Sequence, residues 1–248
     1  MSIATSVAAY LGTTRADVTW LANGAKKVYK EWGAYFDRLH GDVPVPLICV
    51  RVFHETSGNY KAVSSIGETG LLQVQYELQE ECGIGKNPTE PGANVWCGMM
   101  DWNRRSKSLK NKFSNLFPSP NAQFWGCSNL TMSLGGGGTA ALIKGAGVRS
   151  GNELNDLVAF VKTSAFENKD WGTSLGRGVS LSLVAQRVAA AGQWVQAAQQ
   201  LGSLSSSGYG KSPDKTDVVV GGSTTTSSLS TIAIPALLGL LLAWKFFR

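Results

Sequence analysis

The sequence predicts a mainly α-helical domain followed by one membrane-spanning helix. Three observations lead to this fold class. Several long segments place apolar residues at three- and four-residue steps, no segment shows a strong alternation of apolar and polar residues, and the chain ends in an apolar run. With 248 residues, the chain is long enough for one substantial domain and appendages.

Five helices are expected in the domain. The first covers residues 16–39, and its apolar residues share one face: Val18, Leu21, Ala25, Val28, Trp32, Tyr35, Phe36 and Leu39. After a break at 41–46, the run LICVRVF predicts a short apolar helix that leads into Glu55. Further helices are predicted over 93–112, 153–162 and 179–201. A short hairpin over 62–74 is the only β-structure expected.

The end of the chain predicts a membrane anchor. Residues 229–247 are apolar on every face and match the roughly twenty residues that a spanning helix needs. The preceding segment, 203–228, is rich in Ser, Thr and Gly and is typical of a flexible tether. The chain therefore divides into a helical extension (1–40), a main domain (41–202), a linker (203–228) and a transmembrane helix (229–248).

Charge and cysteine content narrow the partners. A net charge of +6 favours an anionic partner such as a cell-wall polymer or lipid headgroups, and no nucleic-acid motif accompanies it. Four Cys without a CxxC pair and two His argue against a metal site, and no cofactor is expected. The cysteines are either small buried residues or form a disulfide such as Cys82–Cys97 or Cys97–Cys127.

Two other features have plain interpretations. The basic stretch over 104–112 is either a solvated helix face or a surface that attracts anionic glycan or lipid. The glycine run 135–138 lacks the Gly-Lys-Ser/Thr ending of a phosphate-binding loop, so a flexible turn is expected there.

The segment FHETSGNYKAVSSIGETGLLQVQ, residues 53–75, holds the main candidate for chemistry. Glu55 follows an apolar run and precedes a turn-rich stretch, where Gly58 and Gly67 suit tight backbone geometry beside a ligand. Glu55 is therefore either a solvated charge at a helix end or a proton-transfer group at the floor of a cleft. The neighbouring His54 either modulates that charge or packs.

From Glu55 to Gln73 the sequence fits the pattern E-S-x-G-N-x-x-A-V-S-x-x-G-x-x-G-L-M-Q without a gap, with Thr56 at the serine position and Leu72 at the methionine position. This stretch resembles the first motif of soluble-type lytic transglycosylases. Asn87-Pro88 and NVWCG, residues 94–98, resemble the second element of that family. The resemblance implies a lysozyme-like fold over about residues 40–195 and an activity on peptidoglycan glycan strands.

The resemblance also implies a mechanism. The β-1,4 bond between N-acetylmuramic acid and N-acetylglucosamine is cleaved, and the muramyl C6 hydroxyl attacks to give a 1,6-anhydro product. Glu55 is then both general acid and general base, so the two-carboxylate scheme of other glycosidases does not apply. Thr56 is its hydroxyl neighbour, and Gly70, Leu71, Leu72 and Gln73 line the sugar cleft.

Two departures from the family pattern keep alternatives open. The A-Y-N-x-G element, whose tyrosine orients the acid, has only residues 131–136 as a counterpart, without Tyr or Asn, and Tyr76 is a candidate replacement. Glu68 is either a solvated loop charge or a second acid. The alternatives are therefore a non-catalytic, membrane-anchored structural or glycan-binding protein, and a hydrolytic muramidase that uses Glu68 or Asp101 to activate water.

The two ends of the sequence predict the setting of the protein: the N-terminus shows no basic, apolar signal segment, whereas the C-terminus predicts an anchor. This combination favours a single-pass protein of a phage virion or its internal membrane, which opens the cell wall during genome entry. A bacterial cell-envelope enzyme is the alternative. Other virion or envelope proteins are candidate partners.

Overall fold

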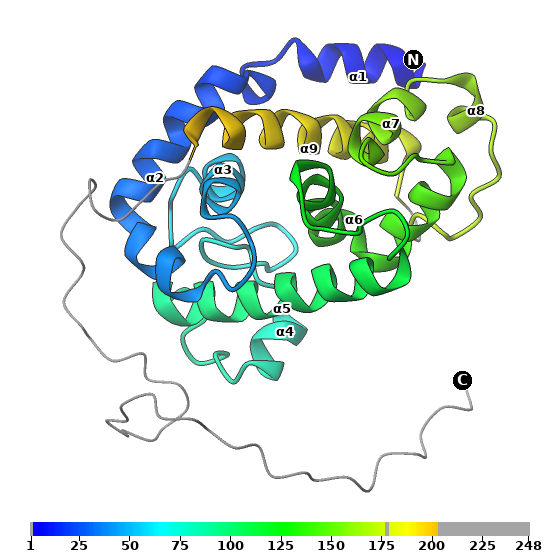
Figure 1. Ribbon diagram of the computed structural model, residues 1–248. Helices are drawn as coiled ribbons and strands as arrows, with labels where there is room; N and C mark the ends of the chain where they lie inside the picture. The colour runs from blue at the N-terminus through cyan, green and yellow to red at the C-terminus, as the bar shows by residue number, and fades with distance from the viewer. Residues whose placement is uncertain (1, 177–178, 203–248) are drawn as a thin grey trace, which may run out of the picture.

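The computed structural model describes residues 2–176 and 179–202, and in these residues the protein is mainly α-helical, as the sequence predicts (Figure 1). The described helices are α1 (Ile3–Leu11), the 3-10 turn η1 (Thr14–Ala16), α2 (Val18–Leu39), α3 (Val45–Thr56), α4 (Tyr76–Glu81), α5 (Pro91–Lys112), α6 (Ala122–Ala146), α7 (Glu153–Phe160), α8 (Ser164–Glu167) and α9 (Leu181–Leu201). None of them is long and apolar enough to cross a membrane. The predicted linker and transmembrane helix, 203–248, lie outside the described residues.

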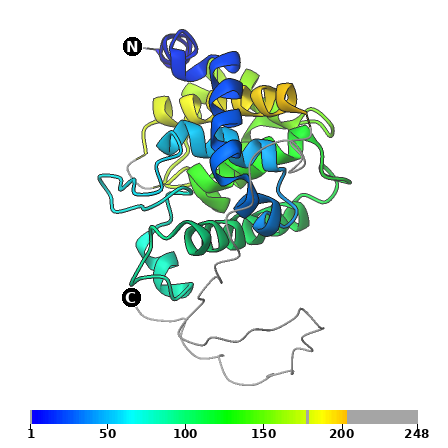
Figure 2. The ribbon, with the colours of Figure 1, turned by 90° about the vertical axis from the view of Figure 1, so that its left-hand side faces the viewer.

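The helix α3 lies at the centre of the molecule. Its residues from Leu47 to Val52 are all buried, as expected for a helix that is apolar on nearly every side. It packs against α2 and α9. Figures 1 and 2 show α9 along one side of α3 and α6, and α5 along the opposite side. The C-terminal end of α3 therefore lies between helices that come from distant parts of the chain.

The N-terminal segment shares the core of the main domain. Val7 of α1 and Leu21, Val28 and Phe36 of α2 are buried in the same apolar cluster as α3 and α9. This packing brings α1 against α9. The Ile3 amide of α1 also donates a hydrogen bond to the carboxylate of Glu167 in α8, 164 residues later in the chain. Residues 1–40 thus contribute to the body that carries Glu55.

The glycine run is the main correction to the predicted elements. Gly135 has non-helical angles (φ 72°, ψ 162°), but Gly136, Gly137 and Gly138 continue as helix within α6. A flexible turn was expected because glycine has a low helix propensity. Packing of α6 against α5, α7 and α9 compensates for that propensity, and only Gly135 keeps the break.

The predicted hairpin is also reduced. Residues 62–74 form a compact loop with two isolated antiparallel bridges, Val63 with Thr69 and Thr69 with Val74, and no β-sheet occurs in the described residues. The amides and carbonyls of Thr69 and Val74 exchange two hydrogen bonds, of 3.1 and 2.9 Å. The loop is closed on itself rather than extended into strands.

The cysteines adopt one of the pairings that the sequence left open. Cys82, which follows α4, forms a disulfide with Cys97 of α5. Cys49 and Cys127 are free and buried. The bond fastens α4, and with it the end of the 62–75 segment, to α5.

Candidate active site

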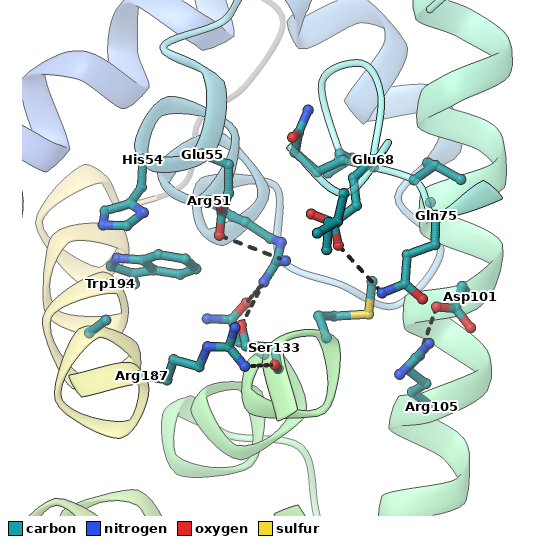
Figure 3. A pocket seen from close by; sticks show the side chains of 18 of the residues that line it. Arg51, His54, Glu55, Glu68, Gln75, Asp101, Arg105, Ser133, Arg187 and Trp194 are labelled. Carbon is teal, nitrogen blue, oxygen red and sulfur yellow. Dashed lines mark hydrogen bonds and ion pairs between the residues drawn. The ribbon is translucent and has the colours of Figure 1, made fainter. Parts of the chain in front are cut away.

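A cavity of about 510 Å³ opens at the end of α3 (Figure 3). Side chains from α1, α3, α5, α6 and α9 and from the loop over residues 66–75 line it. Its volume lies within the range of roughly 300 to 1,000 Å³ that small-molecule sites occupy. The cavity is therefore large enough for sugar units and is built from segments far apart in the sequence.

Glu55 lies at this cavity, in the last turn of α3. The helix ends at Thr56 because the next residue, Ser57, adopts a left-handed conformation (φ 54°). The Glu55 side chain is 32% exposed, and its Oε1 lies 3.9 Å from the Nη2 of Arg51, one helical turn earlier. Glu55 is thus neither fully solvated nor buried, and it borders the cavity.

Arg51 is a site residue that the sequence reasoning missed. Its side chain is only 7% exposed, although it lies in an apolar run. Its Nη1 donates to Asn129 Oδ1 (3.0 Å) and Ser133 Oγ (3.4 Å), and its guanidinium lies 5.7 Å from the ring centres of Trp102 and Trp194. Burial lowers the pKa of Arg51. The available signal was a lone arginine within LICVRVF, four residues before Glu55.

Two further arginines contact the part of α6 that precedes the break at Gly135. A break leaves the carbonyls of the preceding turn without their helical donors, and that end carries partial negative charge. Arg105 of α5 donates to the Thr131 carbonyl (3.0 Å), and Arg187 of α9 donates to the Ser133 carbonyl (2.5 Å). Arg51, Arg105 and Arg187 thus form a basic wall of the cavity next to the glycine run.

The predicted sugar-cleft residues separate into two groups. Leu72 and Gln73 line the cavity with Glu55. Thr56, Gly70 and Leu71 do not: the Thr56 hydroxyl donates to the Val52 carbonyl (2.9 Å), Leu71 is fully buried in the core, and Gly70 lies against α5. These three residues position the cavity wall instead of contacting its contents.

Asn94, in the second motif, fastens the Gly-Leu-Leu-Gln stretch to α5. It is fully buried, its Oδ1 accepts from the Leu72 amide (3.0 Å), and its Nδ2 donates to the carbonyls of Thr69 and Pro88 (2.9 Å each). Gly70 has φ +73°, and a Cβ there would lie 2.3 Å from Asn94 Nδ2. The two motif segments are therefore one structural unit.

Two further carboxylates line the cavity. Glu68 accepts a long hydrogen bond from Gln75 Nε2 (3.4 Å). Asp101 is engaged by Arg104 (2.8 Å) and Arg105 (2.7 Å), and its side chain is only 3% exposed. Asp101 is therefore held by two arginines, whereas Glu68 has only this long hydrogen bond among the described residues.

The tyrosine at the cavity is Tyr10 of α1, not Tyr76. Tyr76 is 61% exposed, donates to Glu80 (2.7 Å) and does not line the cavity. Tyr10 lines it, and burial raises the pKa of Tyr10 to about 12. The sequence reasoning missed Tyr10 because residues 1–40 were assigned to an extension.

Unpaired polar atoms gather at this site. In the described part of the chain, six buried side-chain atoms have no hydrogen-bond partner, and five belong to cavity residues: Tyr10 Oη, Arg51 Nε, both ring nitrogens of His54, and Trp194 Nε1. Buried polar groups in folded proteins are normally paired. No group of three or more His, Cys, Asp or Glu in the described ranges is placed to hold a metal ion.

Replacing His54 with Phe is expected to weaken the acid sensitivity of the fold. Burial lowers the pKa of His54 from 6.5 to about 4, and its ring lies 4.6 Å from that of Trp194. Between pH 6.5 and 4 the unfolded chain binds this proton and the folded chain does not, so stability falls as pH falls through that window. Urea unfolding at pH 7 and pH 4 should show wild type losing about 3 kcal/mol more than His54→Phe. If the wild type and His54→Phe lost the same free energy of unfolding between pH 7 and pH 4, His54 would not be the group responsible for the acid sensitivity.

No protein-family model matches the chain, and no curated protein matches it.

Proposed function

We propose that the protein is a peptidoglycan lytic transglycosylase with Glu55 as its acid and base. The observation that carries the proposal is the position of Glu55: it borders a cavity whose wall also contains Leu72 and Gln73, at the spacing of the family's motif. The fold supports this only as far as its mainly α-helical class. The motif residues supply the chemistry.

In the proposed reaction Glu55 donates a proton to the glycosidic oxygen as the bond to C1 of N-acetylmuramic acid breaks. The ionised Glu55 then accepts the proton of the muramyl C6 hydroxyl, whose oxygen bonds to C1. Glu55 thus regains the proton that it donated, and no water is consumed.

The setting that we propose is a membrane-anchored one. The apolar segment 229–247 would hold the domain at a bilayer, either in the internal membrane or virion of a phage or in a bacterial envelope. Local opening of the cell wall during phage genome entry fits an enzyme that stays attached to its particle.

Full-length protein incubated with purified peptidoglycan is expected to release 1,6-anhydro-muropeptides, which mass spectrometry separates from hydrolytic products. Products with anhydro ends support the proposal, because only internal attack by the C6 hydroxyl gives them. Absence of any product from folded protein would contradict the enzymatic function and leave the non-catalytic, glycan-binding alternative.

A hydrolytic muramidase is the second candidate, and Glu68 is the observation that favours it. Glu68 lines the same cavity as Glu55 and is not held in an ion pair in the described residues. A second carboxylate is what activation of water requires. The same experiment separates the two, because a muramidase leaves reducing ends.

A further inference from the structure

Among the described residues, four arginines and three carboxylates line the cavity that Glu55 borders, so its lining carries one more positive than negative charge. Arg51, Arg105 and Arg187 come from three helices, and each donates a hydrogen bond to α6 within residues 129–133. Figure 3 shows Arg51 and Arg187 beside Ser133, and Arg105 next to Asp101. Arg105 is paired with Asp101, whereas the carboxylate nearest Arg51 is Glu55, at 3.9 Å. Arg187 has no ion pair in the part of the chain that the structure describes.

This wall also holds donors that nothing in the protein uses. Arg51 is 6% exposed and Trp194 is 3% exposed, and the Arg51 Nε and Trp194 Nε1 atoms have no acceptor among the described residues. Both nitrogens are donors only. Their side chains are neighbours, with the guanidinium 5.7 Å from the indole ring centre.

An acceptor-rich anion meets both conditions at once. It supplies the missing negative charge and the missing acceptors, and guanidinium groups bind carboxylates through strong, charge-assisted hydrogen bonds. The two unused donors are covered by neighbouring atoms, so Arg187 is the group that an anion in the cavity contacts first. Binding to the two buried donors requires the Trp194 side chain to move.

We propose that this wall is a carboxylate subsite, formed by Arg187 and Arg51 with the Trp194 indole as a further donor. The source of the carboxylate rests on the proposed function: on peptidoglycan it belongs to the muramyl unit, either to the lactyl group or to the attached peptide. The subsite would make the enzyme select muramyl units over neutral sugars.

Calorimetric titration of the full-length protein with small glycans tests this. The disaccharide GlcNAc-MurNAc carries the lactyl carboxylate and contains no MurNAc–GlcNAc bond, so the proposed reaction leaves it intact. It is expected to bind at least about tenfold more tightly than its lactyl amide or the neutral N,N′-diacetylchitobiose. A GlcNAc-MurNAc probe with an L-Ala-D-Glu stem identifies the preferred carboxylate: tighter binding than the lactyl acid assigns the subsite to the peptide, and weaker binding assigns it to the lactyl group.

Variants locate the preference. Arg187→Gln is expected to reduce the affinity for the acid to that for the amide, and Arg187→Lys to restore part of it. Lys30→Gln removes a positive charge from an exposed position on α2 outside the cavity and should change nothing. Arg51→Gln should also lower the acid preference. If it fails to fold, Trp194→Phe, which keeps an aromatic six-membered ring but removes the N–H donor, should lower that preference.

Two results would overturn the subsite. The first is equal affinity for the acid and the amide, and the second is binding of inorganic phosphate as tight as that of the disaccharide. Failure of the proposed function looks different, because then peptidoglycan yields no products and neither chitobiose nor the muramyl probes bind. Products without a preference for the acid would remove the subsite alone.

Discussion

Glu55→Gln is expected to lower the rate of anhydro-muropeptide release by about a thousandfold. The substitution keeps the shape and a hydrogen-bonding side chain but removes the group that donates and accepts protons, and general acid–base catalysis contributes roughly 10² to 10⁴ to a rate. Glu55 is 32% exposed and its contact with Arg51 is long, so the fold should tolerate the change. Initial rates on purified peptidoglycan, measured by mass spectrometry, give the effect.

Two glutamate variants serve as controls for this result. Glu31→Gln makes the same change at an exposed position on α2 outside the cavity and should leave the rate unchanged. Glu68→Gln should reduce the rate by less than tenfold if the C6 hydroxyl is the nucleophile, whereas a muramidase that uses Glu68 would lose most of its activity. Retention of more than a tenth of the rate by Glu55→Gln would exclude Glu55 as the acid.

Helices with an apolar face were predictable from the sequence because burial of that face is what stabilises them. The helix predicted over 16–39 is Val18–Leu39, and the one predicted over 93–112 is Pro91–Lys112. The short helices α1, α4 and α8 were not predicted. Nine, six and four residues carry too little periodic pattern to identify a helix.

α6 was missed for a different reason. Its sequence contains four consecutive glycines, whose intrinsic preference opposes a helix, and only contacts with α5, α7 and α9 decide otherwise. No local pattern reports such contacts. The break at Gly135, which follows the carbonyls that Arg105 and Arg187 bind, could not be located from sequence either.

In the candidate site, too, the residues of a local motif were predictable, whereas those brought in by tertiary packing were not. Glu55, Leu72 and Gln73 belong to one continuous motif, so their spacing predicts that they act together, and all three line the cavity. Tyr10 and Trp194 lie on helices at opposite ends of the described chain, and both line the cavity because α1 packs on α9. The motif therefore identifies the acid, and tertiary packing supplies its surroundings.

Asn94→Ala is expected to destabilise the protein by roughly 3 kcal/mol, because it removes one hydrogen bond from each of three backbone groups and leaves the buried Leu72 amide without an acceptor. The Leu72 amide loses its acceptor, and the carbonyls of Thr69 and Pro88 lose a donor. Asn94 is fully buried, so water cannot replace these bonds without opening the structure. Urea unfolding monitored by circular dichroism measures the change in the free energy of unfolding.

Asn103→Ala is the matched control, since it makes the same change nine residues later on α5. Asn103 also bridges backbone groups, accepting from the Asp42 amide and donating to the carbonyls of His40 and Met99, but it is only half-buried and lies outside the cavity. It should cost less stability and leave peptidoglycan cleavage intact below its unfolding transition. Asn94→Ala should lose most of its cleavage even while folded, because Leu72 and Gln73 line the cavity with Glu55 and the Leu72 amide is no longer tied to α5. Equal effects of the two variants on cleavage would mean that Asn94 stabilises the fold without positioning the site.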